Sequence, residues 1–129
     1  MHELSIAMSL VERASEEAAR RGGCRIEALY LRLGPLSGVV EDALRFSWDL
    51  ATAETPVAGA RLEIEHVPLV VRCPGCEAER ELPSVQLFRC PACGGPVDEV
   101  VTGRELELRA LEITDREEAA VAGEDRRSP

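Results

Sequence analysis

Four cysteines arranged as two Cys-x-x-Cys pairs constrain the fold of this chain more than any other feature. The pairs are Cys73/Cys76 and Cys90/Cys93, and thirteen residues separate them. Two residues between cysteines let a single turn aim both sulfurs at one ion, and the prolines and glycines around each pair suit tight turns. Two such knuckles supply four thiolates in a tetrahedron, which structural zinc prefers. The segment is therefore predicted to fold around one metal ion, with Zn(II) as the first candidate.

Other interpretations of the four cysteines stay open at this point. Tetrahedral sulfur also suits iron in a rubredoxin-like site, although only Phe88 is available nearby to shield a redox centre. Four unrelated buried cysteines are a purely structural alternative. A thioredoxin-like dithiol would need one reactive pair rather than two matched pairs. Four protein ligands leave no open position for water, so zinc-dependent hydrolysis is not expected.

Net charge narrows the range of partners. The chain carries 24 acidic and 15 basic residues, a formal net charge of −9, and a zinc ion with four thiolates adds two further negative charges. Phosphate would be repelled, so nucleic-acid binding is not expected and protein contact is the better interpretation of the metal segment. No apolar run approaches the roughly 20 residues of a membrane span, and no export signal is visible. A cytoplasmic protein without a membrane span is predicted.

Hydrophobic periodicity predicts two helices and three strands around the cysteine segment. Apolar residues at spacings of three and four indicate the helices, and alternating apolar residues indicate the strands. The predicted helices are 4–21 and 39–53, and the predicted strands are 25–33, 61–67 and 105–113. Gly22-Gly23 stops the first helix, because glycine readily adopts the left-handed conformation that follows a helix. The fold class is α+β: a small mixed sheet of about three strands, two helices and an inserted zinc-ribbon-like module with four cysteines.

The metal segment is predicted to interrupt a second, larger domain. Residues 68–98 hold the four paired cysteines and five of the eight prolines. The predicted organisation is a discontinuous α+β domain of residues 1–67 and 99–113 around a zinc-binding module at 68–98. Residues 114–129 carry many charges and few large apolar side chains, which predicts a disordered tail.

The first three residues offer a second kind of metal site. In Met1-His2-Glu3, the α-amine, the His2 amide nitrogen and the His2 imidazole can close two fused chelate rings in one plane. A fourth donor, from the Glu3 amide or a nearby side chain, would complete a square. Square-planar nitrogen coordination favours Ni(II) or Cu(II) over zinc. The alternative is that His2 has no role beyond preceding a helix.

The other histidine and the fifth cysteine are interpreted as structural residues. His66 shares the alternating face of Leu62 and Ile64, which favours a core or strand-end position over a role as metal ligand. Cys24 follows two glycines at the start of a predicted strand, and it is expected to be a small buried residue.

Further motifs join the chain start and the cysteine pairs in a recognisable order. They are Met1-His2-Glu3-Leu4-Ser5, Leu33-Gly34-Pro35-Leu36-Ser37-Gly38-Val39, Glu41-Asp42-Ala43-Leu44-Arg45-Phe46 and the twin Cys-x-x-Cys pairs. In this order, and from Met1 to about Ile113, the chain resembles the HypA/HybF family. Members of this family are nickel metallochaperones for [NiFe]-hydrogenase maturation, and some also serve urease.

The resemblance implies a role for each motif. His2 corresponds to the family's nickel-binding histidine, with Met1, Glu3 and backbone nitrogens in or near the site, and Cys73, Cys76, Cys90 and Cys93 correspond to its structural zinc ligands. It implies a small mixed sheet backed by two helices, with the zinc module inserted before the last strand. The implied cargo is Ni(II) and the resident metal is Zn(II). The implied partners are the GTPase HypB, the hydrogenase large-subunit precursor and, for some members, urease accessory proteins.

Three functional classes therefore compete. The first is a nickel carrier that is not an enzyme. The second is an acidic zinc-ribbon module for protein or nucleic-acid binding, whose nucleic-acid form is opposed by the negative charge. The third is a small redox or zinc enzyme, opposed by the closed four-thiolate site and by the lack of any paired nucleophile and base. Nickel binding by the native chain start separates the carrier from the other two.

Overall fold

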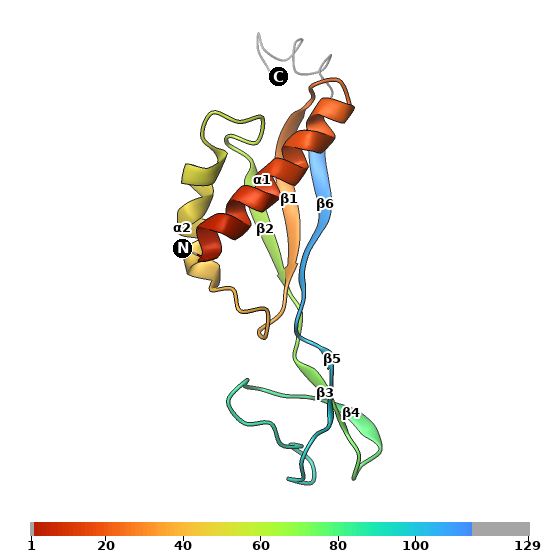
Figure 1. Ribbon diagram of the computed structural model, residues 1–129. Coiled ribbons are helices and arrows are strands. Elements are labelled where there is room, and N and C mark those ends of the chain that lie inside the picture. The colour runs from red at the N-terminus through yellow and green to blue at the C-terminus, as the bar shows by residue number, and fades with distance from the viewer. Residues whose placement is uncertain (1, 115–129) are drawn as a thin grey trace. The chain divides into compact units, whose positions relative to one another are not determined.

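The computed structural model describes residues 2–114, which form two helices and six strands (Figure 1). The elements in chain order are α1 (His2–Arg20), β1 (Arg25–Leu33), α2 (Glu41–Thr52), β2 (Arg61–His66), β3 (Val70–Cys73), β4 (Ala78–Glu81), β5 (Glu99–Thr102) and β6 (Leu106–Thr114). They build two three-stranded sheets, with strand orders β2-β1-β6 and β4-β3-β5. Among these residues, no helix combines the length and the apolar character that a membrane span requires.

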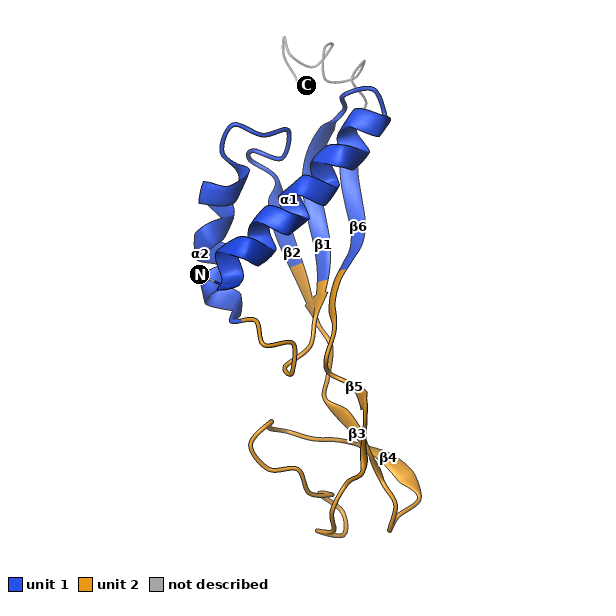
Figure 2. Ribbon diagram, in the orientation of Figure 1, with its two compact units in different colours: residues 1–31, 40–63, 108–129 blue, residues 32–39, 64–107 orange. Residues whose placement is uncertain are grey.

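The chain divides into two compact units, coloured separately in Figure 2. Unit 1 comprises residues 1–31, 40–63 and 108–129, and unit 2 comprises residues 32–39 and 64–107. The predicted tail overlaps the fold by one residue, because Thr114 is the last residue of β6. The rest of that tail, residues 115–129, lies outside the described residues.

The first helix of unit 1 buries a stripe of small and aliphatic side chains. The buried residues recur at spacings of three and four, as on one face of a helix; they are Ala7, Leu10, Val11, Ala14 and Ala18. Figure 1 shows α1 lying across one face of the strands of unit 1. The predicted stop is confirmed: α1 ends at Arg20, and Gly22 and Gly23 follow with φ of 87° and 89°.

The central strand β1 is covered on both faces. Successive side chains of a strand point to opposite faces, and the consecutive residues Ala28 and Leu29 are both fully buried. Polar side chains connect the neighbouring strands on the surface. The Tyr30 hydroxyl donates a 2.9 Å hydrogen bond to Glu112, and the Arg61 guanidinium contacts the same carboxylate at 3.1 Å.

The second helix is anchored by its only tryptophan. Leu44 and Trp48 are buried on α2, and the Trp48 indole N–H donates a 3.1 Å hydrogen bond to the Ala60 carbonyl. The same helix exposes Phe46 and Leu50, which are 88% and 70% accessible. α2 contacts α1 within unit 1, so the two helices share the packing of this unit.

The cysteine segment contains a sheet that the sequence analysis did not predict. In unit 2, β3 pairs antiparallel with both β4 and β5. A small core of Leu69, Val71 and Leu82 packs against this sheet. Each strand is only four residues long, which is too short for an alternating pattern to be recognised.

A close approach of two backbone segments in unit 2 requires glycine at position 34. The Gly34 N–H donates to the Glu105 carbonyl at 2.8 Å, and the Leu36 N–H donates to the Gly103 carbonyl at 2.7 Å. A Cβ atom on residue 34 would overlap the backbone carbonyl of Gly103. The Leu33–Val39 motif therefore serves a packing role.

Candidate metal centre

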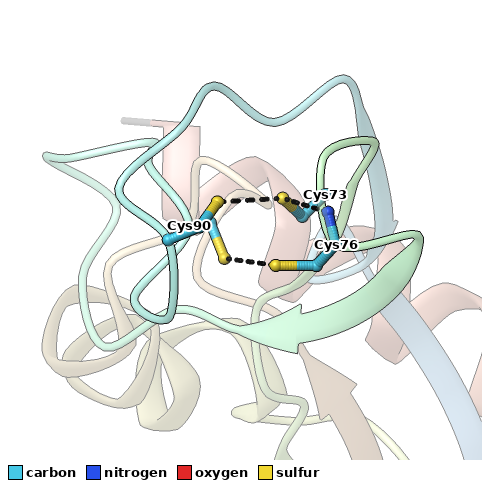
Figure 3. A group of neighbouring side chains, drawn as sticks. Cys73, Cys76 and Cys90 are labelled. Carbon is cyan, nitrogen blue, oxygen red and sulfur yellow. Dashed lines mark hydrogen bonds between the residues drawn. The ribbon is translucent and has the colours of Figure 1, made fainter.

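The four paired cysteines of unit 2 converge on one point. Their Sγ atoms all lie within 4.8 Å of one another, and Figure 3 shows the sulfurs of Cys73, Cys76 and Cys90 facing a common centre. The Cys73–Cys93 separation is 3.6 Å and the Cys76–Cys90 separation is 3.8 Å. A metal–sulfur bond of about 2.3 Å in a regular tetrahedron gives sulfur–sulfur edges of about 3.8 Å. The cluster therefore fits a tetrahedral ion with four thiolate ligands.

Each pair of cysteines sits in a turn that ends in a left-handed residue. Cys73 is the last residue of β3, and the turn after Cys76 places Glu77 at a φ of 53°. The second pair uses a glycine at the same point, because Gly94 follows Cys93 with a φ of 76°. Both turns orient backbone N–H groups toward sulfur. The donors are Cys76 to Cys73, Ala92 to Cys90 and Gly95 to Cys93, each at 3.4 Å.

These contacts shift the pKa values of the Cys90 and Cys93 thiols in opposite directions. Hydrogen bonds from backbone N–H groups, that of Cys93 first, lower the pKa of the Cys90 thiol to about 6. At Cys93 the Gly95 N–H also lowers the pKa, but the three neighbouring thiols outweigh it and raise the pKa to about 11. The Cys90 thiol therefore loses its proton more readily than the Cys93 thiol. A divalent cation would stabilise the thiolate form of every ligand.

The chain start provides the other predicted site, in unit 1. His2 is the first residue of α1, and its side chain is exposed. The Glu3 carboxylate accepts a 3.0 Å hydrogen bond from the backbone N–H of Val40, and this bond is the main cause of a lowered Glu3 pKa. Met1 lies outside the described residues.

The two predicted sites belong to different compact units. His2 and Glu3 belong to unit 1, whereas the four paired cysteines belong to unit 2. Sequence reasoning missed Val40, whose backbone N–H contacts the Glu3 carboxylate at the chain start. No sequence signal announces Val40, which lies 37 positions from Glu3.

The other predicted structural residues behave differently from each other. Cys24 is buried, as expected, and its thiol lies 4.0 Å from the Ala18 carbonyl. His66 is the last residue of β2 and is exposed. Its strand-end position is confirmed, and a core position is wrong. The strand leaves the covered part of the sheet before position 66, since Ile64 is already only half-buried.

Comparison with known proteins gives a consistent result over nearly the whole chain. The family described as "Hydrogenase/urease nickel incorporation, metallochaperone, hypA" matches residues 1–113. Hydrogenase maturation factor HypA of Roseiflexus sp. (strain RS-1) is 56% identical over 122 residues, covering 95% of this chain and 99% of that protein. The protein of the same name from Chloroflexus aurantiacus is 58% identical over 112 residues, covering 87% of this chain and 98% of that protein.

Two solved structures resemble the fold. The solution structure of the nickel metallochaperone HypA from Helicobacter pylori aligns with a TM-score of 0.59 at 21% identity, covering 88% of this chain and 98% of that one. A second solution structure, also of a HypA protein, aligns with a TM-score of 0.65 at 22% identity, covering 90% and 98%. At these identities the likeness supports the predicted α+β fold, with two helices and small sheets.

Proposed function

Because this chain belongs to the HypA family of nickel-incorporation metallochaperones, we propose that it carries Ni(II) to the large-subunit precursor of a [NiFe]-hydrogenase. The observation that carries this proposal is the family match over residues 1–113. That range includes both the chain start and the four-cysteine cluster. The cargo and the resident metal are therefore assigned to two different sites.

We assign the cargo to the chain start. Nickel is held by the α-amine that the chain carries when Met1 is its first residue, by the His2 amide and by the His2 imidazole. Glu3 lies beside this site, and its carboxylate accepts a hydrogen bond from the Val40 N–H. A fourth donor from a nearby side chain would complete the square. Planar coordination through these nitrogens favours Ni(II) or Cu(II).

The position of His2 at the start of α1 supports this assignment. The first N–H groups of a helix have no intrahelical acceptor, so the His2 amide can lose its proton to a metal without breaking a helical hydrogen bond. The positive end of a helix dipole opposes a bare cation. Deprotonated amide ligands offset the charge of Ni(II), so binding with loss of amide protons avoids that penalty.

Release of the cargo follows from the exposure of the same residues. The His2 side chain is exposed, so an incoming ligand can displace the imidazole without unpacking the core. The chain contributes orientation and donor atoms, and it performs no covalent chemistry on the metal. We therefore describe it as a carrier rather than an enzyme.

We assign Zn(II) to Cys73, Cys76, Cys90 and Cys93. The sulfur–sulfur separations and the backbone N–H donors support a closed tetrathiolate site. Bound zinc would cross-link the two knuckles of a unit whose own core is small. Metal analysis decides between zinc and the iron alternative.

The partners and compartment follow from the proposed role. The GTPase HypB and the hydrogenase precursor are the proposed partners, and urease accessory proteins are a second destination for the cargo. We place the protein in the cytoplasm. The net charge of −9 supports contact with proteins rather than with nucleic acid.

Metal analysis and nickel titration of the full chain test the proposal. We expect one zinc per chain, no iron, and one further equivalent of Ni(II). His2→Ala should lose the nickel and keep the zinc, whereas Ser9→Ala, an exposed control on the same helix, should keep both. Zinc without any nickel binding would favour the interaction module, and iron would overturn the zinc assignment.

A further inference from the structure

A groove in unit 1 lies between α1 and the last strand of its sheet. Its volume is about 550 Å³, and the described residues that line it come from positions 13–21 of α1 and 108–113 of β6. Both stretches belong to unit 1, and Figure 1 shows the second half of α1 crossing the sheet toward β6. This α1–β6 groove contains none of the residues assigned above to nickel or zinc.

One wall of the groove is a strand at the edge of a sheet. Among residues 2–114, the strand order β2-β1-β6 gives β6 a single neighbour. β6 is nine residues long, and the outer N–H and C=O groups of an edge strand can pair with a further strand. Addition of an extended segment to such an edge is a recurring mode of peptide recognition.

The side chains that β6 contributes to the groove are mainly apolar. Leu108, Leu111 and Ile113 line it and are half-buried. The acidic side chains of the strand contact neighbouring strands instead: Glu107 lies 3.1 Å from Arg32, and Glu112 lies 3.1 Å from Arg61. An added strand would therefore meet aliphatic side chains along this wall.

The charge of the groove is opposite to that of the whole chain. Among the described residues that line it, four are arginines and two are glutamates, whereas the chain has a net charge of −9. Glu17 is held by Arg20 at 2.9 Å and by Arg21 at 2.8 Å. The helix dipole favours cations at the end of α1, which accounts for Arg20 and Arg21 but not for Arg13 or for Arg109 on the strand. The groove is thus complementary to an acidic ligand.

We propose that the α1–β6 groove is a docking site for an acidic, extended segment of a partner protein, which adds to the edge of β6 as a further strand. Backbone hydrogen bonds to β6 supply affinity, and the arginines select carboxylates. Arg13 lies roughly 16 Å from His2 along the helix axis, at 1.5 Å per residue. A partner held in the groove therefore leaves the chain start open for its cargo; this last step rests on the proposed nickel site, whereas the docking site does not.

Titration of a synthetic peptide into the full zinc-loaded chain tests the docking site by nuclear magnetic resonance. The probe is a capped peptide of about eight residues, within the usual length of a strand, in which valine and glutamate alternate. We expect amide chemical-shift changes concentrated in residues 13–21 and 108–113, and weaker binding as salt is raised. A matched peptide with glutamine in place of glutamate should bind at least about tenfold more weakly.

Charge reversal on each wall tests the role of the arginines. Arg13→Glu on α1 and Arg109→Glu on β6 should each weaken binding of the glutamate peptide at least about fivefold, while Arg104→Glu stays within about twofold of the wild type. Arg104 is exposed in unit 2 and does not line the groove, so it controls for the change in net charge. Equal affinities of the three variants would contradict the selection of carboxylates by the groove.

N-methylation of the peptide separates strand addition from simple attraction between charges. Methylation of every peptide nitrogen keeps the carboxylates and removes the donors that a strand needs, so the methylated peptide should not bind. This comparison uses the wild-type chain alone and stands even if a variant does not fold. Undiminished binding of the methylated peptide would overturn strand addition.

The remaining outcomes decide who occupies the groove. No binding of the glutamate peptide to the full chain, which still carries residues 115–129, would overturn the proposal. A concentration-dependent dimer that the peptide dissociates would also overturn it, because the groove would then belong to a second copy of the chain. The titration contains no nickel, so its failure would leave the nickel proposal standing, and loss of nickel binding would leave the docking site standing.

Discussion

The Glu3 carboxylate accepts a 3.0 Å hydrogen bond from the backbone N–H of Val40. A side chain in the first turn of α1 therefore caps the N-terminus of α2. Val40 is the N-cap residue of α2 and its side chain makes no capping hydrogen bond. In a capping box, a glutamate three residues into the helix accepts the N–H of the N-cap residue. Ala43 occupies that position here, and Glu3 replaces it from another helix.

This contact predicts a pH-dependent stability difference for Glu3→Gln. The Val40 N–H lowers the Glu3 pKa below its ordinary value of 4.5, so the carboxylate stabilises the fold fully above 4.5 and loses its contribution as pH falls through the lowered pKa. The variant should melt at a lower temperature than the wild type at pH 7, and the gap should close on acidification. Glu12→Gln, exposed on the same helix, is the control. Equal melting temperatures for the wild type and Glu3→Gln at every pH would contradict the role of the contact.

Gly34→Ala should destabilise unit 2 through a steric clash. The added Cβ would overlap the Gly103 carbonyl, and overpacking of this kind typically costs about 1–3 kcal/mol or more. Gly38→Ala isolates the effect of backbone conformation, because Gly38 has a φ of 84° and open space around its Cα. Its cost should be about 1–2 kcal/mol. Denaturant unfolding measures both, and a harmless Gly34→Ala would refute the close approach.

Two substitutions on α2 should differ sharply although both remove a large apolar side chain. Leu44 is fully buried, so Leu44→Ala should cost about 2–5 kcal/mol. Phe46 is 88% exposed, so Phe46→Ala should change the free energy of unfolding by no more than about 0.5 kcal/mol. Fluorescence of Trp48, the only tryptophan, reports unfolding of this helix. Equal effects of the two substitutions would mean that α2 packs by a different face.

Cys90→Ser should remove the metal and unfold the segment around it. Structural zinc of this type contributes about 10–16 kcal/mol of apparent binding free energy, and the core of Leu69, Val71 and Leu82 is small. The two helices should persist, since they pack within unit 1, and the helical circular dichroism signal should therefore remain. Cys24→Ser is the matched control and should keep zinc. A Cys90→Ser chain with stoichiometric zinc would contradict the assignment of this ligand.

Local patterns predicted the parts of the fold that local chemistry determines. The stop of α1 follows from Gly22-Gly23, and the convergence of the cysteines follows from the spacing of each pair. The β4-β3-β5 sheet could not be predicted, because four-residue strands are too short to show a period and are held by pairing with each other. The exposure of His66 could not be predicted from the alternating pattern of β2, because a strand can continue past the layer that covers it.

The site predictions were limited by long-range contacts. The chain start and the cysteines could be identified as candidate metal sites from residue types alone. The engagement of the Glu3 carboxylate depends on a partner 37 positions away, and the pairing of Ala78 with Cys73 depends on the register of β4 against β3. Both contacts arise from tertiary packing rather than from the local sequence.

Isothermal titration of Ni(II) into zinc-loaded protein tests the central claim most directly, with the native chain compared to a chain that carries one glycine before Met1. The addition replaces the α-amine at Met1 by an amide and leaves His2, Glu3 and the four cysteines unchanged. If nickel is held by the chain start, the native protein binds one equivalent, and the extended protein binds it at least about tenfold more weakly, a loss of about 1.4 kcal/mol or more, with its zinc content unaltered. Equal nickel affinity in the two proteins would contradict the account, because the α-amine would then not be a ligand.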